Sequence, residues 1–213
     1  MEKNLNWAVL GTGVIANEMA QALKAMGKTL YAVGNRTHEK AVTFAEQYQV
    51  AKVYDDFHEM FTDPDVDVIY ITTPHNTHIG FVREALKNKK HVLCEKSITL
   101  NSLELEEALA LAKENDVIFA EAMTIWHMPL YKKLWELIDA GKTGTYASNA
   151  NEEHEEIADW LADGVPALGK VQMIQLNFGS YKEYNMKNRF FNMDLAGGAL
   201  LDIGVYALSI ARS

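Results

Sequence analysis

Residues 7–26 constrain the fold more than any other stretch of the chain. An apolar run, Trp7–Leu10, leads into Gly-Thr-Gly at 11–13, and the apolar residues that follow recur at a helical period until Gly27. The run is typical of a buried strand, and Gly27 is placed to end the helix. Strand, glycine turn and helix in this order predict the first βαβ unit of a parallel sheet, of the kind that binds a dinucleotide.

The residue types in the turn suit contact with a pyrophosphate. Gly11 permits the tight turn, Gly13 lets the backbone approach phosphates, and Ala16 allows helix and strand to pack closely. The helix start adds N–H groups and the positive end of a dipole. A purely structural turn is the alternative. The residues expected to contact the dinucleotide here are Gly11, Thr12, Gly13, Val14 and Ile15.

The end of the second predicted strand, 30–35, indicates which dinucleotide is bound. Where NAD is the cofactor, an acidic residue about 20 positions after the glycine turn accepts hydrogen bonds from the ribose. The chain has Asn35 and Arg36 at this point and no acid. A guanidinium can bind a 2′-phosphate through two hydrogen bonds, so the sequence predicts NADP, with NAD as the alternative cofactor. The competing interpretation is an Arg36 that faces solvent.

Strands and helices alternate through the first half of the chain. Further strands are predicted at 52–54, 66–72, 91–95 and 117–121, and helices at 37–48, 56–61, 77–88, 101–114 and 129–141. This alternation predicts an α/β fold, a doubly wound parallel sheet with helices on both faces.

Two polar segments follow apolar strands and are expected at the ligand-binding edge of the sheet, because the carboxyl ends of parallel strands meet there. The first segment, 72–78, is Thr-Thr-Pro-His-Asn-Thr-His, and the second begins with Glu95 and Lys96. The residues of these segments expected at the cofactor are Thr72, Thr73, Pro74, Asn76, His78, Glu95 and Lys96.

Three residues are candidates for proton transfer. Lys96 follows a buried strand, and Asp202 and Tyr206 lie four apart on the last predicted helix, so they share a face. A cation beside a phenol lowers the pKa of the phenol, and a carboxylate can orient both groups, which gives a proton relay for alcohol–carbonyl interconversion. The alternatives are a surface lysine balanced by Glu95 and a tyrosine–aspartate pair with a packing role.

The second half of the chain is less regular. The segment 143–167 contains six acids and no Lys or Arg, and it has the character of a mobile surface excursion that includes a helical stretch at 152–161. One strand, 170–178, and one helix, 199–211, follow, with 181–195 irregular. Neither element can bury its apolar face alone, so we expect an incomplete α+β domain at 126–213 after a dinucleotide-binding domain at 1–125.

Composition narrows the function classes. The net charge of −9 argues against nucleic acid as a partner, and the single cysteine, Cys94, fits a cytoplasmic location. No signal peptide or 18-residue apolar run is evident, so no membrane span is expected. The seven histidines follow no metal-ligand spacing, and no metal site is predicted.

Four separated motifs resemble the Gfo/Idh/MocA family of NAD(P)-dependent oxidoreductases. They are GTGVIA at 11–16, TTPHNTHIGFVREALKNKKHVLCEKS at 72–97, AEAM at 120–123 and GGALLDIGVYAL at 197–208. The resemblance implies a Rossmann domain followed by an α+β domain whose open sheet often forms a homo-oligomer. Lys96 matches the lysine of the family's E-K-P signature, and Asp202 and Tyr206 match its D-x-G-x-[YH] helix. The tyrosine version resembles the dihydrodiol dehydrogenase and glucose–fructose oxidoreductase branch.

The chain departs from the family pattern in three places. Ser97 replaces the proline of the signature, 143–167 looks inserted, and relatives continue well past Ser213. We expect an oxidoreductase that transfers a hydride between NADP(H) and a sugar, polyol or cyclic diol. Tyr206 would be the general acid/base, Lys96 would polarise it, and Asp202 would orient both. The alternative is a non-catalytic dinucleotide-binding protein or an inactive, C-terminally truncated member.

Overall fold

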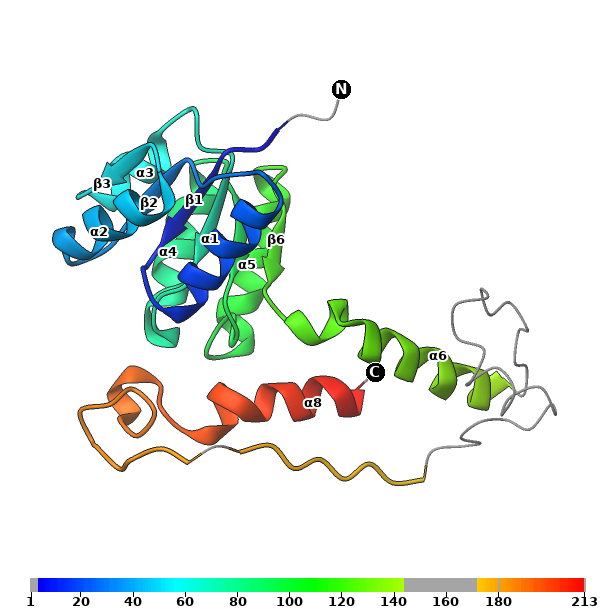
Figure 1. Cartoon of the computed structure of the whole chain (residues 1–213). Helices are drawn as coiled ribbons and strands as arrows, with labels where there is room; N and C mark the ends of the chain where they lie inside the picture. The colour runs from blue at the N-terminus through cyan, green and yellow to red at the C-terminus, as the bar shows by residue number, and fades with distance from the viewer. Residues whose placement is uncertain (1–3, 144–171, 180, 213) are drawn as a thin grey trace. The chain divides into compact units, whose positions relative to one another are not determined.

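The computed structural model describes residues 4–143, 172–179 and 181–212, and they form two compact units. The first unit comprises 1–122 with 182–202, and the second comprises 123–181 with 203–213. The first contains a six-stranded parallel sheet in the order β3-β2-β1-β4-β5-β6 (Figure 1). The predicted Rossmann-type doubly wound sheet is confirmed, and the strand order reverses between β1 and β4.

The sheet and helices of the first unit follow the predicted ranges within a few residues. The strands are β1 Trp7–Leu10, β2 Ala32–Gly34, β3 Lys52–Tyr54, β4 Val68–Ile71, β5 His91–Cys94 and β6 Phe119–Glu121. The helices are α1 Val14–Ala25, α2 His38–Tyr48, α3 Phe57–Thr62, α4 His78–Lys87 and α5 Ser102–Glu114, with a 3-10 turn, η1, at His75–Thr77.

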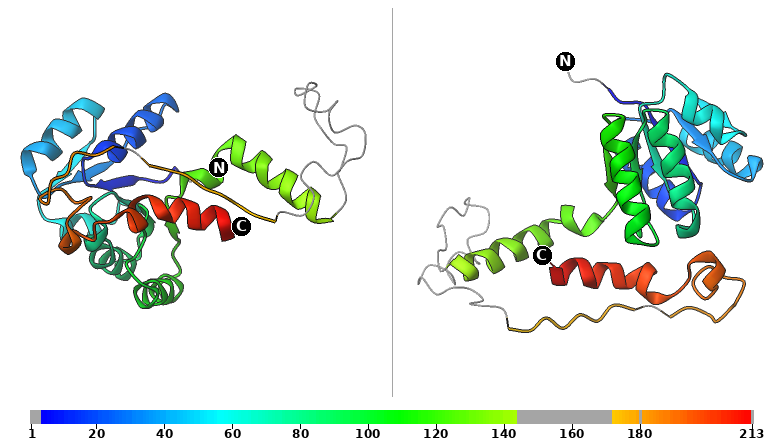
Figure 2. Two further views of the ribbon diagram at one scale, coloured as in Figure 1. Left: turned by 90° about the horizontal axis from the view of Figure 1, so that it is seen from below. Right: turned by 180° about the vertical axis from the view of Figure 1, so that it is seen from behind.

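Helices cover both faces of the sheet, as Figure 2 shows. On one face, buried residues of α3, α4 and α5 pack on Leu10 and Ile69, and on the other α1 and α2 pack on Val9 and Tyr70. The four residues of β4 are all buried, which explains their continuous apolar run. Burial on both faces fixes the register of the central strands and so the position of the loops that follow them.

Two helix starts differ in how they are capped. Asn101 and Glu104 have the spacing of an Asn-x-x-Glu helix cap in the sequence, and the Asn101 side chain accepts from the Glu104 N–H at 3.0 Å. Thr37 occupies the N-cap position of α2, but its side chain makes no capping hydrogen bond. Instead the Thr37 N–H donates to the Asn35 side chain at 2.8 Å. This turn therefore holds Asn35 in place.

A carboxylate at the opposite end of the sheet ties β3 to the α3–β4 connection. Asp63 accepts from the Tyr31 hydroxyl at 3.2 Å, from Lys52 Nζ at 3.0 Å and from the Tyr54 hydroxyl. Its pKa lies well below the usual range because these donors outweigh the effect of burial. The network stabilises the fold far from the carboxyl edge.

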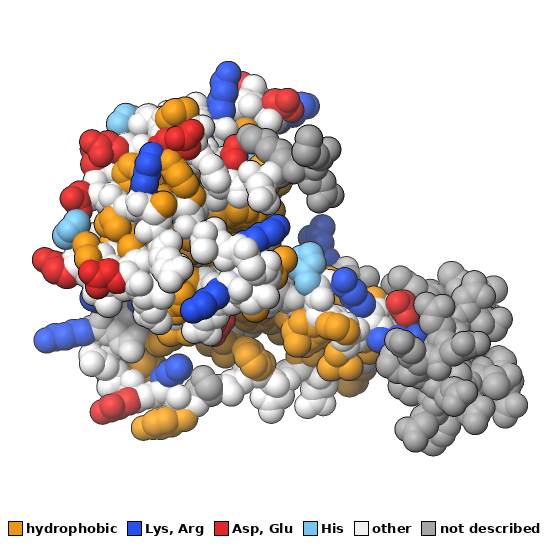
Figure 3. All heavy atoms as spheres, turned by 45° about the horizontal axis from the view of Figure 1, so that its top comes forward, with side chains coloured by type: hydrophobic (Ala, Val, Ile, Leu, Met, Phe, Trp, Pro, Cys, Tyr) orange, Lys and Arg blue, Asp and Glu red, His pale blue; other side chains and the backbone are white. Residues whose placement is uncertain are grey.

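The second unit contains a 3-10 turn, η2 Thr124–His127, and the helix α6 Pro129–Thr143. Trp126 stacks on Trp135 with ring centroids 5.8 Å apart. The sequence predicts that the apolar residues of α6 face inward, but Leu130 is 73% exposed. The prediction is wrong for Leu130 because the described residues of this unit provide no core for the first turn to cover. Figure 3 shows other hydrophobic side chains at the surface.

The predicted strand 170–178 is not formed at 172–178, the part of it that the structure describes. A strand needs a neighbour for its hydrogen bonds, and no strand among the described residues pairs with this segment. Phe178 nevertheless packs edge-on against Tyr206, with ring centroids 5.9 Å apart. The expected helix 199–211 is present as one π-helical turn, η5 Leu200–Gly204, followed by α8 Val205–Arg212.

The predicted acidic excursion and its helical stretch at 152–161 lie outside the described residues. One stretch, Met193–Arg212, is long and apolar enough to cross a membrane by length and composition. This corrects the expectation that no such run exists. The signal is weak, because Ala196 is left-handed and interrupts the helix.

Candidate functional site

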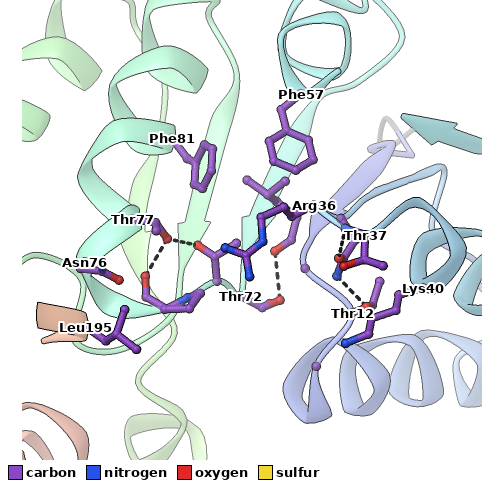
Figure 4. A pocket seen from close by; sticks show the side chains of 16 residues that line it. Thr12, Arg36, Thr37, Lys40, Phe57, Thr72, Asn76, Thr77, Phe81 and Leu195 are labelled. Atoms are coloured by element: carbon purple, nitrogen blue, oxygen red, sulfur yellow. Dashed lines mark hydrogen bonds between the residues drawn. The ribbon is translucent and has the colours of Figure 1, made fainter. Parts of the chain in front are cut away.

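A pocket of about 520 Å³ opens at the carboxyl edge of the sheet, where the strand order reverses between β1 and β4. It is lined by Leu10, Gly11, Thr12, Gly13, Asn35, Arg36, Thr37, Lys40, Phe57, Thr72, Thr73, Pro74, Asn76, Thr77, Phe81 and Leu195. This is the edge at which open α/β sheets bind ligands. Figure 4 shows the residues that line it.

The glycine turn forms the floor between the two walls. Gly11 has φ +107° and its N–H donates to the Gly34 carbonyl at 2.8 Å. A Cβ at Gly11 would lie 2.6 Å from Thr72 Oγ1, so only glycine fits there. A Cβ at Gly13 would meet nothing within 4 Å. The space beside Gly13 is therefore open to a ligand that approaches the backbone.

The first turn of α1 is suited to an anion. Gly13 is the N-cap and supplies no side chain, and the first turn contains no acid. The positive end of the helix dipole therefore faces the pocket with no carboxylate to oppose it. Val14 and Ile15 also lie on this turn, but their side chains are exposed outside the pocket wall.

One wall of the pocket is polar and basic. Asn35 Nδ2 donates to Thr12 Oγ1 at 2.7 Å, which joins the end of β2 to the glycine turn. Arg36 and Lys40 follow on the same side (Figure 4). Sequence reasoning found Arg36 and missed Lys40. Arg36 precedes the N-cap of α2 and Lys40 lies on its first turn, so only the structure shows that both line the same wall.

The opposite wall is the segment after β4. Thr72 Oγ1 donates to the Leu10 carbonyl at 3.0 Å, and the Thr73 and Thr77 hydroxyls lie 2.7 Å apart. Thr72, Thr73, Pro74 and Asn76 all line the pocket, and their contact with a cofactor stays a prediction. These bonds fix the segment to β1 and to η1.

Two aromatic rings that sequence reasoning missed also line the pocket. Phe57 and Phe81 meet edge to face with centroids 5.6 Å apart. Their positions look like ordinary core positions in the sequence, and only the packing of α3 against α4 brings them together. They give the pocket an apolar end.

His78 lies beneath the loop rather than in the pocket wall. Its side chain is fully buried, and its ring nitrogens lie 2.8 Å from the Thr73 carbonyl oxygen and 2.9 Å from that of Ser97. Burial lowers its pKa. His78 therefore connects the loop after β4 to the turn after β5, and direct contact with a cofactor stays a prediction.

Glu95 also lies outside the pocket wall, and it is half-buried. The Tyr70 hydroxyl donates to its carboxylate at 2.5 Å. Burial raises the pKa of Glu95. This arrangement orients the end of β5, from which Lys96 projects.

Lys96 contacts Asp202, although the two residues are far apart in the sequence. Lys96 Nζ donates to the Asp202 backbone carbonyl and lies 3.1 Å from Asp202 Oδ1. Both side chains are mostly buried, at 15% and 22% exposed. A guanidinium nitrogen of Arg189 lies 3.6 Å from the same Oδ1. The structure therefore brings together two of the three predicted proton-transfer residues and adds Arg189, which sequence reasoning missed.

Ser97, at the family's proline position, also contacts this segment. Its hydroxyl donates to the Leu201 carbonyl at 2.7 Å, and the Lys96–Ser97 peptide bond is cis. Tyr206 belongs to the second unit, four residues after Asp202 on α8. Among the described residues no cluster of His, Cys, Asp or Glu could hold a metal ion.

The family model for the oxidoreductases with an NAD-binding Rossmann fold, Gfo/Idh/MocA, matches residues 5–123, more than half of the chain. The chain belongs to this family. A second model, the Gfo/Idh/MocA C-terminal domain, matches residues 154–213. This range overlaps the segment that we expected to be an insertion, and the domain boundary itself stays a prediction.

Several curated relatives are named as dehydrogenases. The chain is 34% identical over 205 residues to trans-1,2-dihydrobenzene-1,2-diol dehydrogenase of Xenopus laevis, covering 95% of this chain and 54% of that protein. It is 31% identical to D-xylose 1-dehydrogenase (NADP(+)) of Hypocrea jecorina, covering 96% and 51%. The chain therefore spans about half the length of the curated relatives it matches.

Solved structures agree with the fold. KijD10, a 3-ketoreductase from Actinomadura kijaniata in complex with NADP and TDP-benzene, matches with a TM-score of 0.61 and 26% identity over 65% of this chain and 43% of that one. A point mutant of KijD10 matches 98% of this chain and 57% of that one with a TM-score of 0.70 at 24% identity, which supports the fold alone.

Proposed function

We propose that the protein is an NADP(H)-dependent oxidoreductase that acts on a CH–OH group of a sugar, polyol or cyclic diol. One observation carries the proposal: the pocket above the glycine turn is walled by two cations, Arg36 and Lys40, and the Lys96–Asp202 pair lies at the end of a strand in the same sheet. The names of the relatives, a diol and a xylose dehydrogenase, support the substrate class.

The pocket residues fit a dinucleotide. The open space at Gly13 and the acid-free start of α1 suit a pyrophosphate. Thr12, Asn35 and the segment after β4 would hold its sugars through hydroxyl and amide groups. Phe57 and Phe81 offer an apolar surface to a base. These residues together would bind both halves of the cofactor.

The cation pair favours NADP over NAD. The ordinary ribose-binding acid is absent between Gly34 and Thr37, so no carboxylate would repel a 2′-phosphate. Arg36 can bind the phosphate through two hydrogen bonds, and Lys40 adds a second positive charge. Both side chains are exposed at the pocket mouth, where a phosphate can reach them.

The residues of this chain would supply the proton chemistry. Bound NADP(H) supplies the hydride acceptor or donor. During oxidation the carbinol C–H bond would break as the hydride leaves, and the hydroxyl proton would pass to the phenolate of Tyr206, which becomes the neutral phenol. Lys96 would stabilise the developing charge on oxygen, and Asp202 holds Lys96 through the observed ion pair. Reduction reverses each step.

A second candidate is a dinucleotide-binding protein without turnover. The chain covers about half of its curated relatives, and 172–178 forms no strand. A substrate pocket built on that segment would lack support. Cofactor binding is common to both candidates, so turnover decides between them.

Fluorescence titration with NADPH and NADH tests the cofactor. We expect tighter binding of NADPH, and Arg36→Ala and Lys40→Ala should each cost about 1–3 kcal/mol in NADPH affinity, the scale of a charge-assisted hydrogen bond. NADH affinity should hardly change. Lys113→Ala, on α5 away from the pocket, is the matched control. Equal affinities for both cofactors in the native protein would refute the NADP proposal.

A turnover assay separates the two candidates. D-Xylose and trans-1,2-dihydrobenzene-1,2-diol, with NADP in excess, sample the two substrate classes. Reduction of NADP supports the enzyme, and cofactor binding with no reduction supports the second candidate. The domains 1–125 and 126–213 can be expressed separately to test the proposed boundary.

The remaining proposals concern the binding partners and the location of the protein. The partners would be small molecules and further copies of the chain. Nucleic acid is not proposed because the net charge is −9, and a membrane is not proposed because the signal for a membrane span is weak. A single cysteine supports a cytoplasmic location. Sedimentation and binding to nucleic acid test these points.

A further inference from the structure

The loop 188–198 packs tightly although the sequence predicts it only as irregular. It contains a 3-10 turn, η4 Met193–Leu195, and its ends are joined by a hydrogen bond from the Gly198 N–H to the Phe190 carbonyl at 3.0 Å. A Cβ at Gly197 would lie 2.5 Å from the Arg189 carbonyl oxygen and 2.6 Å from that of Asn192. Glycine at this position therefore lets the loop close on itself.

One side of this loop reaches the pocket. Leu195 lines it, although the residue is more than 100 positions from the glycine turn in the sequence. Asn76 Nδ2 donates to the Asp194 carbonyl at 3.4 Å, which attaches the loop to the segment after β4. In Figure 4 Leu195 lies beside Asn76, across the pocket from Arg36 and Lys40. The loop therefore forms part of the wall opposite the cations.

The other side of the loop reaches the predicted proton-transfer residues. The Arg189 guanidinium lies over the Phe190 ring at 4.3 Å and 3.6 Å from Asp202 Oδ1. Asp202 in turn pairs with Lys96. A single short loop thus contacts the pocket at one end and Asp202 at the other.

We propose that Leu195 contacts the bound dinucleotide directly, so that cofactor binding fixes the loop 188–198. The proposal rests on the proposed function for the identity of the ligand. Leu195 is half-buried in the free protein, and a ligand in the pocket would cover the rest of its apolar surface. Arg189 is a positioning residue, because the loop that carries it then holds Asp202 against Lys96.

Affinity measurements with matched variants test the contact. Leu195→Ala should lower the affinity for NADPH and for NADH by about three- to tenfold, the scale expected for loss of part of an apolar contact. The factor should be the same for both cofactors, because Leu195 lies away from the cations. Leu195→Met should restore most of the affinity. Met193→Ala is the control, since Met193 is on the same turn but 85% exposed and outside the pocket.

A glycine pair tests the loop without removing Leu195. Gly197→Ala should lower the affinity for both cofactors at least as much as Leu195→Ala does, because the added Cβ forces the loop open. Gly80→Ala, on α4, meets nothing within 4 Å and should leave affinity unchanged. Circular dichroism confirms that each variant keeps its helices.

Hydrogen exchange supplies a second measurement. NADPH should slow exchange at the Gly197 and Gly198 amides in the native protein and have less effect in Leu195→Ala. If the native protein binds neither cofactor, the proposed function fails. If it binds NADPH while Leu195→Ala binds equally well, or while exchange in 188–198 is unchanged, the function stands and the proposal for this loop is overturned.

Discussion

Lys96 and Asp202, 106 residues apart in the sequence, form a mostly buried ion pair at 3.1 Å, in which the lysine also donates to the backbone carbonyl of the aspartate. A pair with only 15% and 22% of its side chains exposed is screened weakly by salt, and each charge depends on the other. Asp202 lies in η5, the π-helical turn directly before α8. The pair therefore ties the end of β5 to η5.

The proposed relay predicts non-additive losses. Lys96→Met and Tyr206→Phe should each reduce turnover by about 10²–10⁴, the usual contribution of general acid–base catalysis. The double variant should be scarcely worse than either single variant, because residues that act as a unit lose their effect together. Steady-state kinetics measure turnover, and a NADPH titration verifies that binding survives. Losses that multiply would show that the two residues act independently.

The two glycines of the turn should differ in what they disturb. Gly11→Ala should lower stability, because the new Cβ lies 2.6 Å from Thr72 Oγ1 and φ is +107°. Gly13→Ala should leave stability nearly unchanged, because φ is −74° and no atom lies within 4 Å, yet it should weaken cofactor binding by filling that space. Thermal unfolding and NADPH titration of both variants check this. Equal behaviour of the two would contradict it.

Because His75 is buried, the free energy of unfolding should decrease in mild acid. Burial, then the charges of the neighbouring His78, Arg189 and Lys96, lower its pKa to about 4, with Asp202 opposing them. In the unfolded chain the His75 ring takes up a proton near pH 6.5, whereas in the folded protein it stays neutral until about pH 4. Stability should therefore fall as the pH drops from about 6.5 to 4, by roughly 3 kcal/mol from this residue.

The measurement is urea unfolding across this pH range. His75→Asn should show a shallower slope than the native protein, and His127→Asn, an exposed histidine, should keep the native slope. Comparing the slopes of the native protein and the variants cancels the contribution of the carboxyl groups, which all of these proteins share. Parallel curves for the native protein and His75→Asn would exclude the assignment.

The sequence predicts the strands, turns and helix caps whose formation depends on a few neighbouring residues. Sheet strands such as β4 are buried on both faces and read as continuous apolar runs, and Gly11 and Asn101 occupy positions where few residue types fit. Because these preferences act over a few residues, a single sequence reveals them. The alternation of strand and helix then predicted the parallel sheet.

Contacts over long distances were beyond the same reasoning. Leu195 and Arg189 reach the site only because the loop 188–198 packs with residues 1–122 in the first unit, and no local pattern signals that. Residues 172–178 have strand character, but a strand forms only with a partner. Lys40 lies on the first turn of α2, whereas Arg36 precedes the helix, so no helical spacing in the sequence indicated that both line the pocket.

The last prediction concerns how stability is distributed. β1 and β4 lie at the centre of the sheet with nearly all side chains buried, so their amides should open only with global unfolding. Residues 172–178 are exposed and form no strand, and α8 has no buried residue. Their amides should exchange faster by orders of magnitude through local opening. Hydrogen exchange with mass spectrometry compares 7–10 and 68–71 with 172–178 and 205–212. Equal protection would contradict this distribution and would mean that interactions outside the described contacts stabilise the second unit.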